Sequence, residues 1–375
     1  MSTTVPDDTG RQPVPAAGGA HAAPPAGPPA AAPTATAPVK REVEADPRGI
    51  RALIFIRDRG IFVLWVLLLV AFAIWDHPFF ASVDNGILIA NAAALTAIFA
   101  AGVAVGIICG ALDLSIPGTA AMAACTCGYL MTHGQPVWLS LVAGLAIGVV
   151  VGLLNGLISL RGFNPIIVTI GMLSITTAGA SIIAKGYSIP GLNALEFMGT
   201  RRYAGVPAPV WVAAVLFLLG TIFLTRTRDG LRLMAVGGNP EAVRRSGIHS
   251  DRYKVLGFVI SSVCAALGGL VSTAVVTEAS PEASPAIIFT ALTAVALAGV
   301  SLAGGRGSLP RVLVGALVLA TISNGLTIKG VNPYWGTGVT GLLLLGSLGL
   351  EKWVSTTVSK RLVLTAQASV HSGKQ

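Results

Sequence analysis

Charged residues are scarce in this chain. Only 11% of its 375 residues are Asp, Glu, Lys or Arg, whereas a soluble globular domain carries about 25%. Hydrophobic residues make up 53% of the chain, and the mean hydropathy is +0.77. This composition excludes an ordinary soluble domain and predicts a protein that lies largely within a membrane.

Potential metal ligands are also few. The five histidines form no metal-ligand pair, and the four cysteines lie inside apolar stretches, where they are expected to pack as small side chains. Cys125 and Cys127 are two positions apart, so they face different sides of a helix, which is poor metal or disulfide spacing. We therefore expect no metal site and no catalytic constellation.

One glycine-rich segment could be mistaken for a nucleotide site. Gly304-Gly305-Arg306-Gly307 lacks the Lys-Ser/Thr that completes a phosphate-binding loop. It is better interpreted as a tight cytoplasmic turn. The chain is therefore expected to bind no cofactor and not to be an enzyme.

Long apolar segments, by contrast, fill most of the sequence. A helix needs about 20 apolar residues to cross a bilayer, and ten segments approach that length. We predict an all-α polytopic membrane protein with a transmembrane domain at 51–356, a disordered Pro/Ala-rich tail at 1–50 and a second tail at 357–375. The predicted spans are 55–75, 87–108, 116–132, 137–159, 165–185, 208–225, 255–277, 286–303, 310–328 and 335–353.

The basic residues sort by membrane side. If the N-terminus is cytoplasmic and the spans alternate, 21 basic residues are cytoplasmic, and four lie outside: Lys185, Arg201, Arg202 and Lys329. This bias supports ten spans in the inner membrane with both termini in the cytoplasm. The net charge of +9 then reflects topology, and no nucleic-acid partner is expected.

Glycines recur every four residues along two of the predicted spans. The positions are Gly102, Gly106 and Gly110 on the second span, and Gly144, Gly148, Gly152 and Gly156 on the fourth. Small residues at this spacing let helix backbones approach closely in lipid. We expect helix packing, with a backbone lining for a pore as the alternative.

Asp113 is the acid closest to the predicted membrane core. An ionisable residue at that depth is a candidate for a transport role. Because Ser115 and Pro117 follow it, Asp113 could instead cap the third span. Both interpretations remain open, and the remaining polar candidates for a translocation path or a helix cap are Ser115, Asn155, Asn164 and Thr169. Asn155 and Asn164 are expected mainly to form hydrogen bonds between helices.

The predicted cytoplasmic loop 226–254 contains a short helix with complete start and stop signals. They are a cap, a first-turn proline, an early acid, two late bases and a glycine past the end: Asn239, Pro240, Glu241, Arg244, Arg245 and Gly247. A helix of about two turns is marginal in water. We expect a partner protein to hold it, with the lipid headgroups of the membrane surface as the alternative.

These residues belong to an ordered set of motifs. From the N-terminus the set is Gly110-Ala111-Leu112-Asp113-Leu114-Ser115, Asn155-Gly156, Thr169-Ile170-Gly171-Met172, Asp229-Gly230, Ala235-Val236-Gly237-Gly238-Asn239-Pro240-Glu241-Ala242, Ser246-Gly247-Ile248, Gly299-Val300-Ser301-Leu302-Ala303-Gly304-Gly305-Arg306-Gly307 and Asn324-Gly325-Leu326. Over about residues 50–350 the chain resembles the ribose/xylose-type permeases of ABC importers. No single motif is decisive, but their order is.

The resemblance implies a function and partners. The chain would be a permease subunit that pairs with a second permease subunit, identical or different, and sits on an ABC ATPase that binds ATP and Mg. An extracytoplasmic solute-binding protein would deliver a monosaccharide or polyol for transport by alternating access. The helix at 239–247 would couple the ATPase to the spans, through Gly237, Gly238, Asn239, Pro240, Glu241, Ala242, Arg244, Arg245, Gly247 and Ile248.

Departures from the family pattern leave the solute open. Ala111 replaces a glycine, Ile288 stands where the family usually has an acid, and Pro310-Arg311 replaces an apolar residue and a glycine. Branched-chain amino acids or nucleosides are alternative solutes. Rival classes are an ion-coupled carrier, which should show paired intramembrane charges or interrupted helices, and a non-transporting scaffold.

Overall fold

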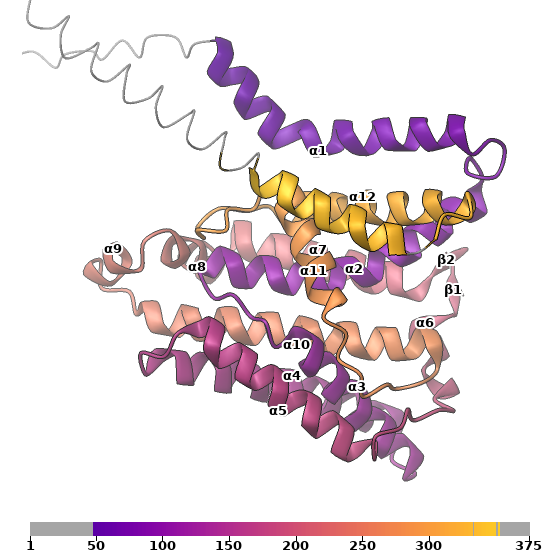
Figure 1. The fold of residues 1–375 in the computed structure, drawn as a ribbon. Coiled ribbons are helices and arrows are strands. Elements are labelled where there is room, and N and C mark those ends of the chain that lie inside the picture. The colour runs from indigo at the N-terminus through magenta and orange to yellow at the C-terminus, as the bar shows by residue number, and fades with distance from the viewer. Residues whose placement is uncertain (1–47, 333, 350–351, 353–375) are drawn as a thin grey trace, which may run out of the picture. The chain divides into compact units, whose positions relative to one another are not determined.

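The computed structural model describes residues 48–332, 334–349 and 352 (Figure 1). Residues 1–47 of the tail predicted at 1–50, the whole tail predicted at 357–375, and residues 350, 351 and 353 of the last predicted span lie outside the described residues. The first helix begins at Arg48, inside the segment that was assigned to the N-terminal tail.

The described part of the chain is mostly helical. The long helices are α1 (Arg48–Trp75), α2 (Val83–Cys109), α3 (Ile116–Thr132), α4 (Val137–Leu160), α5 (Pro165–Ile183), α7 (Ala208–Arg226), α10 (Ser250–Val276), α11 (Ala286–Leu297) and α12 (Leu309–Ile328), with a further helical stretch at 334–349. Among the described residues, six helices are long and apolar enough to cross a membrane: α2, α4, α5, α7, α10 and α12. The predicted helical membrane fold is confirmed.

Short elements lie in two of the connections between long helices. Between α5 and α7 lie η1 (Asn193–Leu195), α6 (Glu196–Gly199) and a two-stranded antiparallel hairpin of β1 (Arg202–Tyr203) and β2 (Val206–Pro207). Between α7 and α10 lie α8 (Arg228–Gly238) and α9 (Pro240–Arg245). The second connection contains the short helix predicted from its capping residues.

The span predicted at 286–303 is too long. Helix α11 ends at Leu297, and residues 298–308 form a loop. Gly299, Gly304 and Gly305 have φ values of 67°, 85° and 75°, which belong to the left-handed region that glycine adopts readily. The apolar composition continues beyond the helix, but Gly299 ends it: the N–H of Gly299 donates to the Ala296 carbonyl at 2.9 Å, and Gly304 and Gly305 belong to the turn that follows.

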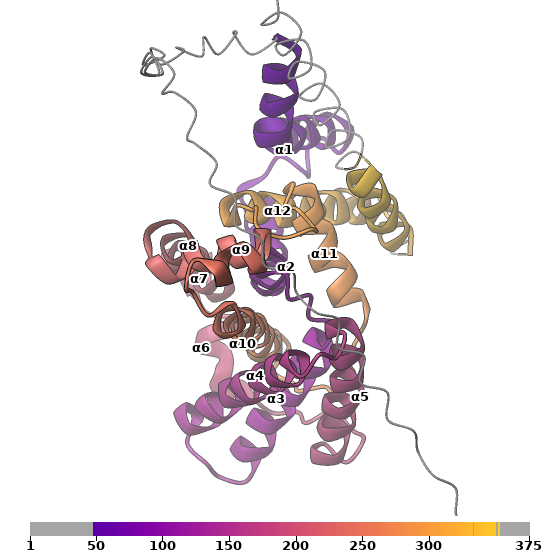
Figure 2. The same ribbon diagram turned by 90° about the vertical axis from the view of Figure 1, so that its left-hand side faces the viewer.

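Helices α2 and α10 form the interior of the bundle. In the most apolar 18-residue window, 83% of α2 and 61% of α10 is buried, against 22% of α5. Helix α10 packs against α2, α3 and α4 (Figures 1 and 2). The helices with exposed apolar faces therefore surround two buried ones.

The glycine repeat of α4 lies against α10. A Cβ atom added at Gly148 would stand 2.6 Å from the Ser262 carbonyl oxygen, and one at Gly152 would stand 2.5 Å from the Cα atom of Val259. Gly144 and Gly156 also face α10, and Gly102 of α2 faces it from the other side. Backbone contact at this distance is open only to glycine.

Candidate functional site

The connection between α2 and α3 crosses the interior of the bundle without helical structure. Gly110 ends α2 at φ 78°, and its N–H donates to the Ile107 carbonyl at 2.9 Å. The N–H of Ala111 donates to the carbonyl of Gly106 at 2.7 Å, so the helix ends in a glycine C-cap motif. Gly110 is therefore a helix terminator, in contrast to the packing role that the spacing suggested.

Non-helical backbone at membrane depth needs partners inside the protein. Ala111, Asp113 and Ser115 alternate with less buried residues along the connection, and all three are buried. Residues 110–115, here called the α2–α3 link, therefore direct one face into the bundle.

Asp113 is the centre of a buried polar cluster. Its Oδ1 accepts hydrogen bonds from the N–H and the hydroxyl of Ser115, and its Oδ2 accepts one from the Ser262 hydroxyl of α10 at 2.9 Å. Asn155 of α4 donates through Nδ2 to Ser115 Oγ at 2.9 Å, and Nδ2 lies 3.4 Å from Asp113 Oδ1. The carboxylate therefore joins the link to α4 and α10 through uncharged donors.

Two polar atoms of this cluster have no hydrogen-bond partner among the described residues. They are Oδ1 of Asn155 and the hydroxyl oxygen of Ser261, which is also near Asp113. Each of these residues is buried. A buried polar group without a partner costs about 1–3 kcal/mol, so the cluster carries unused bonding capacity.

The N-cap residue of α3 is Ser115, whose side chain makes no capping hydrogen bond, while Asp113 accepts a hydrogen bond from the Ser115 N–H.

The other two sequence candidates, Asn164 and Thr169, make their hydrogen bonds outside this cluster. Asn164 is exposed and accepts from the Ile166 N–H at 2.9 Å, so it is a helix cap rather than an interhelical hydrogen bonder. Thr169 is buried, and its hydroxyl donates to the Ile166 carbonyl within α5.

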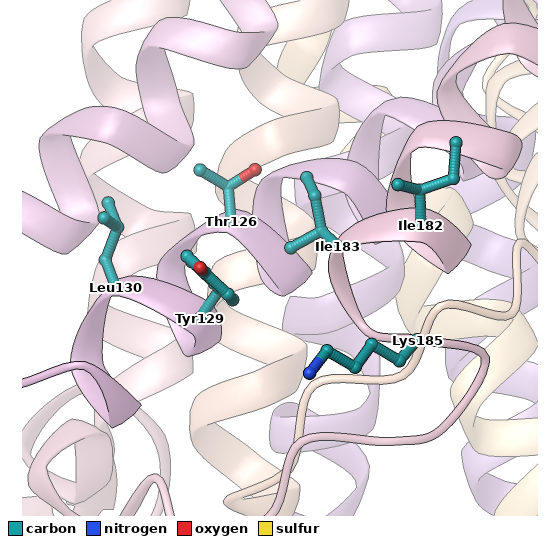
Figure 3. Close-up of a pocket in the computed structure, with 6 residues that line it drawn as sticks. All are labelled: Thr126, Tyr129, Leu130, Ile182, Ile183 and Lys185. Atoms are coloured by element: carbon teal, nitrogen blue, oxygen red, sulfur yellow. The ribbon is translucent and has the colours of Figure 1, made fainter.

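Two cavities lie at the ends of the helices. One, of about 270 Å³, borders the start of the α2–α3 link, and its polar lining includes Ser159, Asp251 and Lys254. The other, of about 330 Å³, lies between the ends of α3 and α5 (Figure 3). Its lining is mainly hydrocarbon and consists of Thr126, Tyr129, Leu130, Ile182, Ile183 and Lys185.

Helix α8 is amphipathic and is fixed at its first turn. Leu233 and Val236 are buried in the same core as the end of α2. At the start of the helix, the Tyr253 hydroxyl of α10 donates to Asp229 Oδ1 at 2.9 Å, and Arg232 donates to that hydroxyl at 3.2 Å. The hydrogen bond with Tyr253, together with Asp229, raises the pKa of the Arg232 guanidinium.

Helix α9 follows α8 directly (Figure 2). It carries the predicted caps. Asn239 Oδ1 accepts from the Ala242 N–H at 3.0 Å. Gly247 has φ 78°, and the N–H groups of Gly247 and Ile248 donate to the carbonyls of Arg244 and Val243, which is the Schellman motif. The short helix is thus defined at both ends by its own sequence.

The surface of α9 is polar. Glu241 lies 2.6 Å from Arg244 and 3.4 Å from Arg245, measured from carboxylate oxygen to guanidinium nitrogen. All of its residues are exposed except Val243, which is half-buried and packs against the main core. An exposed ion pair contributes at most about 1 kcal/mol, so these charges define the surface more than they stabilise it.

Sequence reasoning missed Ser261 and Ser262. Both lie in the middle of a predicted apolar span, where a pair of small hydroxyl residues is an available but weak signal. Their proximity to Asp113 depends on the packing of α10 against the α2–α3 link. Ser262 and Asp113, which share a hydrogen bond, are 149 residues apart in the sequence. Such a long-range contact leaves no local pattern.

Apolar helices of membrane-spanning length packed around a buried non-helical link identify the chain as a helical membrane protein. The chain belongs to the family described as branched-chain amino acid transport system, permease component, which matches residues 86–348. It is accordingly a multi-pass protein of the inner membrane.

Three relatives from Escherichia coli (strain K12) illustrate the family. The ribose import permease protein RbsC is 29% identical over 75% of this chain and 89% of its own length. The L-arabinose transport system permease protein AraH is 30% identical over 78% of this chain and 90% of its own length. The D-allose transport system permease protein AlsC is 29% identical over 79% of this chain and 92% of its own length.

A likeness to a solved structure is weaker. An inward-facing metal-chelate type ABC transporter matches with a TM-score of 0.47 and 17% identity, over 80% of this chain and 98% of that one. At this level of likeness no feature of the site is transferred from it.

Proposed function

We propose that this chain is the membrane-spanning permease subunit of an ATP-driven importer of a monosaccharide or polyol. The observation that carries the proposal is its alignment with three pentose and hexose permeases over 89–92% of their lengths. ATP would be hydrolysed by a separate ABC ATPase. The solute would arrive from a binding protein and cross by alternating access, with a second permease subunit completing the path.

The contacts between loops support ten spans with both termini in the cytoplasm. On the proposed outer side, Lys329 Nζ lies 3.2 Å from Asp76 Oδ1 as an ion pair, and Ile189 pairs with Ala279 through backbone hydrogen bonds. On the proposed inner side, the N–H of Gly305 donates to the Ile108 carbonyl at 2.8 Å. Loops assigned to the same side thus meet each other.

The surface of α9 favours a protein partner over lipid. An interfacial helix needs an apolar face to bury in the headgroup region. In α9 the half-buried Val243 packs against the protein's own core, while Glu241 and two arginines are exposed. A charged, capped and projecting helix suits docking on the ATPase, where it would act as the coupling helix.

The first test is reconstitution of transport. The purified chain in proteoliposomes is expected to take up sugar only when the ATPase subunits, ATP on their side and the binding protein on the opposite side are all present. Uptake of radiolabelled ribose, arabinose and allose should be compared with that of leucine. Faster uptake of leucine would reassign the solute to branched-chain amino acids.

The ion-coupled alternative makes the opposite prediction. Asp113 is hydrogen-bonded to uncharged groups, so the paired charges of an ion relay are not assembled around it. Accumulation of solute by the chain alone under a proton or sodium gradient would contradict the importer proposal.

The caps of α9 provide a second test. Asn239→Ala removes a cap worth about 0.5–2 kcal/mol, and Gly247→Val places a β-branched residue at φ 78°. Because both positions are exposed, abundance in the membrane should change little. Transport and the ATPase activity stimulated by the binding protein should fall together, measured in the reconstituted complex.

Matched variants separate the helix from the side chain. Asn239→Asp keeps a capping oxygen, and Gly247→Asn tolerates the left-handed conformation, so both should retain most of the transport. Wild-type transport and ATPase stimulation in Asn239→Ala and Gly247→Val would show that α9 does not couple the two subunits.

A further inference from the structure

Three backbone segments meet where α2 ends. They are Ile108 near the end of α2, Gly237 near the end of α8, and the Gly304–Gly305 turn between α11 and α12. The N–H of Gly305 donates to the Ile108 carbonyl at 2.8 Å. This meeting point, here called the glycine junction, joins segments that are far apart in the sequence.

The junction leaves no space for side chains. A Cβ atom added at Gly237 would overlap the Ile108 carbonyl oxygen, and it would also stand 2.9 Å from the Gly305 nitrogen. A Cβ atom at Gly304 would stand 2.6 Å from the Gly237 carbonyl oxygen. Because backbone touches backbone here, a displacement of one segment cannot be absorbed by a side-chain rotation.

Gly238 differs from its neighbour. A Cβ atom added there would have its nearest contact at 3.8 Å, at the Cα atom of Gly305, which is ordinary van der Waals distance. The two glycines are adjacent at the end of one helix, but only Gly237 requires the absence of a side chain. This contrast provides a matched pair of positions.

The junction lies between α9 and the α2–α3 link. Helix α9 begins two residues after Gly238, and its one half-buried residue, Val243, packs against the core. On the other side, Ile108 is two residues before the terminator Gly110 and five before Asp113. A displacement of α9 therefore reaches the buried polar cluster by a short path through the junction.

We propose that Gly237 is a positioning residue for ATP-driven transport, through which a movement of α9 displaces the end of α2 and the α2–α3 link. The proposal rests on the function proposed above. It places the transmission of force at a backbone contact, outside the solute path. The cluster around Asp113 then ties the displaced link to α4 and α10, so that three segments move together.

The test compares Gly237→Ala with Gly238→Ala in the complete complex of permease, ATPase and binding protein. The sequence placed Gly238 among the coupling residues, but an added Cβ there meets its nearest neighbour at 3.8 Å, so Gly238→Ala should transport like wild type. In the Gly237→Ala complexes that assemble, the solute concentration for half-maximal uptake should stay the same, because Gly237 lies outside the proposed solute path. Their maximal uptake per ATP hydrolysed should fall at least tenfold, and stimulation by the loaded binding protein should be lost. A general loss of folding would lower assembly and basal hydrolysis as well.

Equal maximal uptake in the two variants would overturn the role of Gly237 and leave the importer proposal intact. No ATP-dependent uptake by the wild-type complex would overturn the proposed function, and the role of Gly237 with it. These two failures are distinguished by the wild-type measurement alone.

Hydrogen exchange in the wild-type complex covers the case in which Gly237→Ala does not assemble. Trapping the ATP-bound ATPase should change amide exchange together in peptides covering 104–112, 231–239 and 300–308. A change at 231–239 with none at 104–112 would overturn the proposal, because the displacement would then stop at α8.

Discussion

Asp113→Ala is expected to destabilise the protein by at least about 3 kcal/mol and to abolish transport. Its carboxylate accepts hydrogen bonds from the Ser115 N–H and hydroxyl and from the Ser262 hydroxyl, all of them buried. Each donor left without a partner costs about 1–3 kcal/mol. The melting temperature of the detergent-solubilised subunit and uptake in proteoliposomes measure the two effects.

Two further variants identify the cause of that loss. Asp84→Ala removes an exposed acid from the first turn of α2 and should leave both measurements nearly unchanged. Asp113→Asn keeps one acceptor oxygen for Ser115, and its new amide can donate to Ser262, whose hydroxyl can reverse its direction. It should therefore be much closer to wild type than Asp113→Ala. Complete loss of transport in a stable Asp113→Asn protein would indicate that the charge itself takes part in transport.

Much of the fold could be predicted from the sequence because its signals are local. Long apolar runs mark the helices: nine of the ten predicted spans overlap the long helices α1–α5, α7 and α10–α12, and the tenth overlaps the helical stretch at 334–349. The caps of α9 could also be predicted, since Asn239 and Gly247 act on groups within a few residues. Local interactions leave local patterns.

The meeting of distant segments could not be predicted in the same way. Ser262 and Asp113 are 149 residues apart in the sequence. Ile108 is likewise distant in the sequence from Gly237 and Gly305, although the three meet in space. The glycines were visible in the sequence, and Gly304–Gly305 was correctly interpreted as a turn. What the sequence did not contain was the identity of the backbone that each glycine would contact, because glycine has no side chain to indicate a neighbour.

The loop after α11 shows a third limit. Composition extends the apolar span to residue 303, whereas the helix ends at Leu297. Hydropathy reports whether a segment can be buried, but not whether its backbone is helical. Val300 is fully buried although it lies in the loop, so an apolar run and a helix need not have the same end.

The glycine repeat of α4 leads to the second large effect. Gly152→Ala is expected to destabilise the isolated subunit by about 1–3 kcal/mol or more, the usual cost of overpacking. The new methyl group would stand 2.5 Å from the Cα atom of Val259 and 2.8 Å from the Phe258 carbonyl oxygen. Both are backbone atoms of α10, so α4 and α10 must move apart to make room.

Gly171→Ala in α5 is the matched control, because an added Cβ there meets open space in the described part of the chain. Alanine is favoured over glycine within a helix by up to about 1 kcal/mol, so this variant should be neutral or slightly stabilised. The two substitutions are chemically identical, but Gly152→Ala should lower the melting temperature of the detergent-solubilised subunit, whereas Gly171→Ala should leave it unchanged or raise it slightly. Equal shifts would show that α4 and α10 are not in close backbone contact at Gly152. A lower melting temperature for Gly152→Ala alone is the expected result, because the glycine spacing lets α4 lie directly on α10. Helix α10 carries Ser262, so this packing also holds Asn155 of α4 and Ser262 together around Asp113.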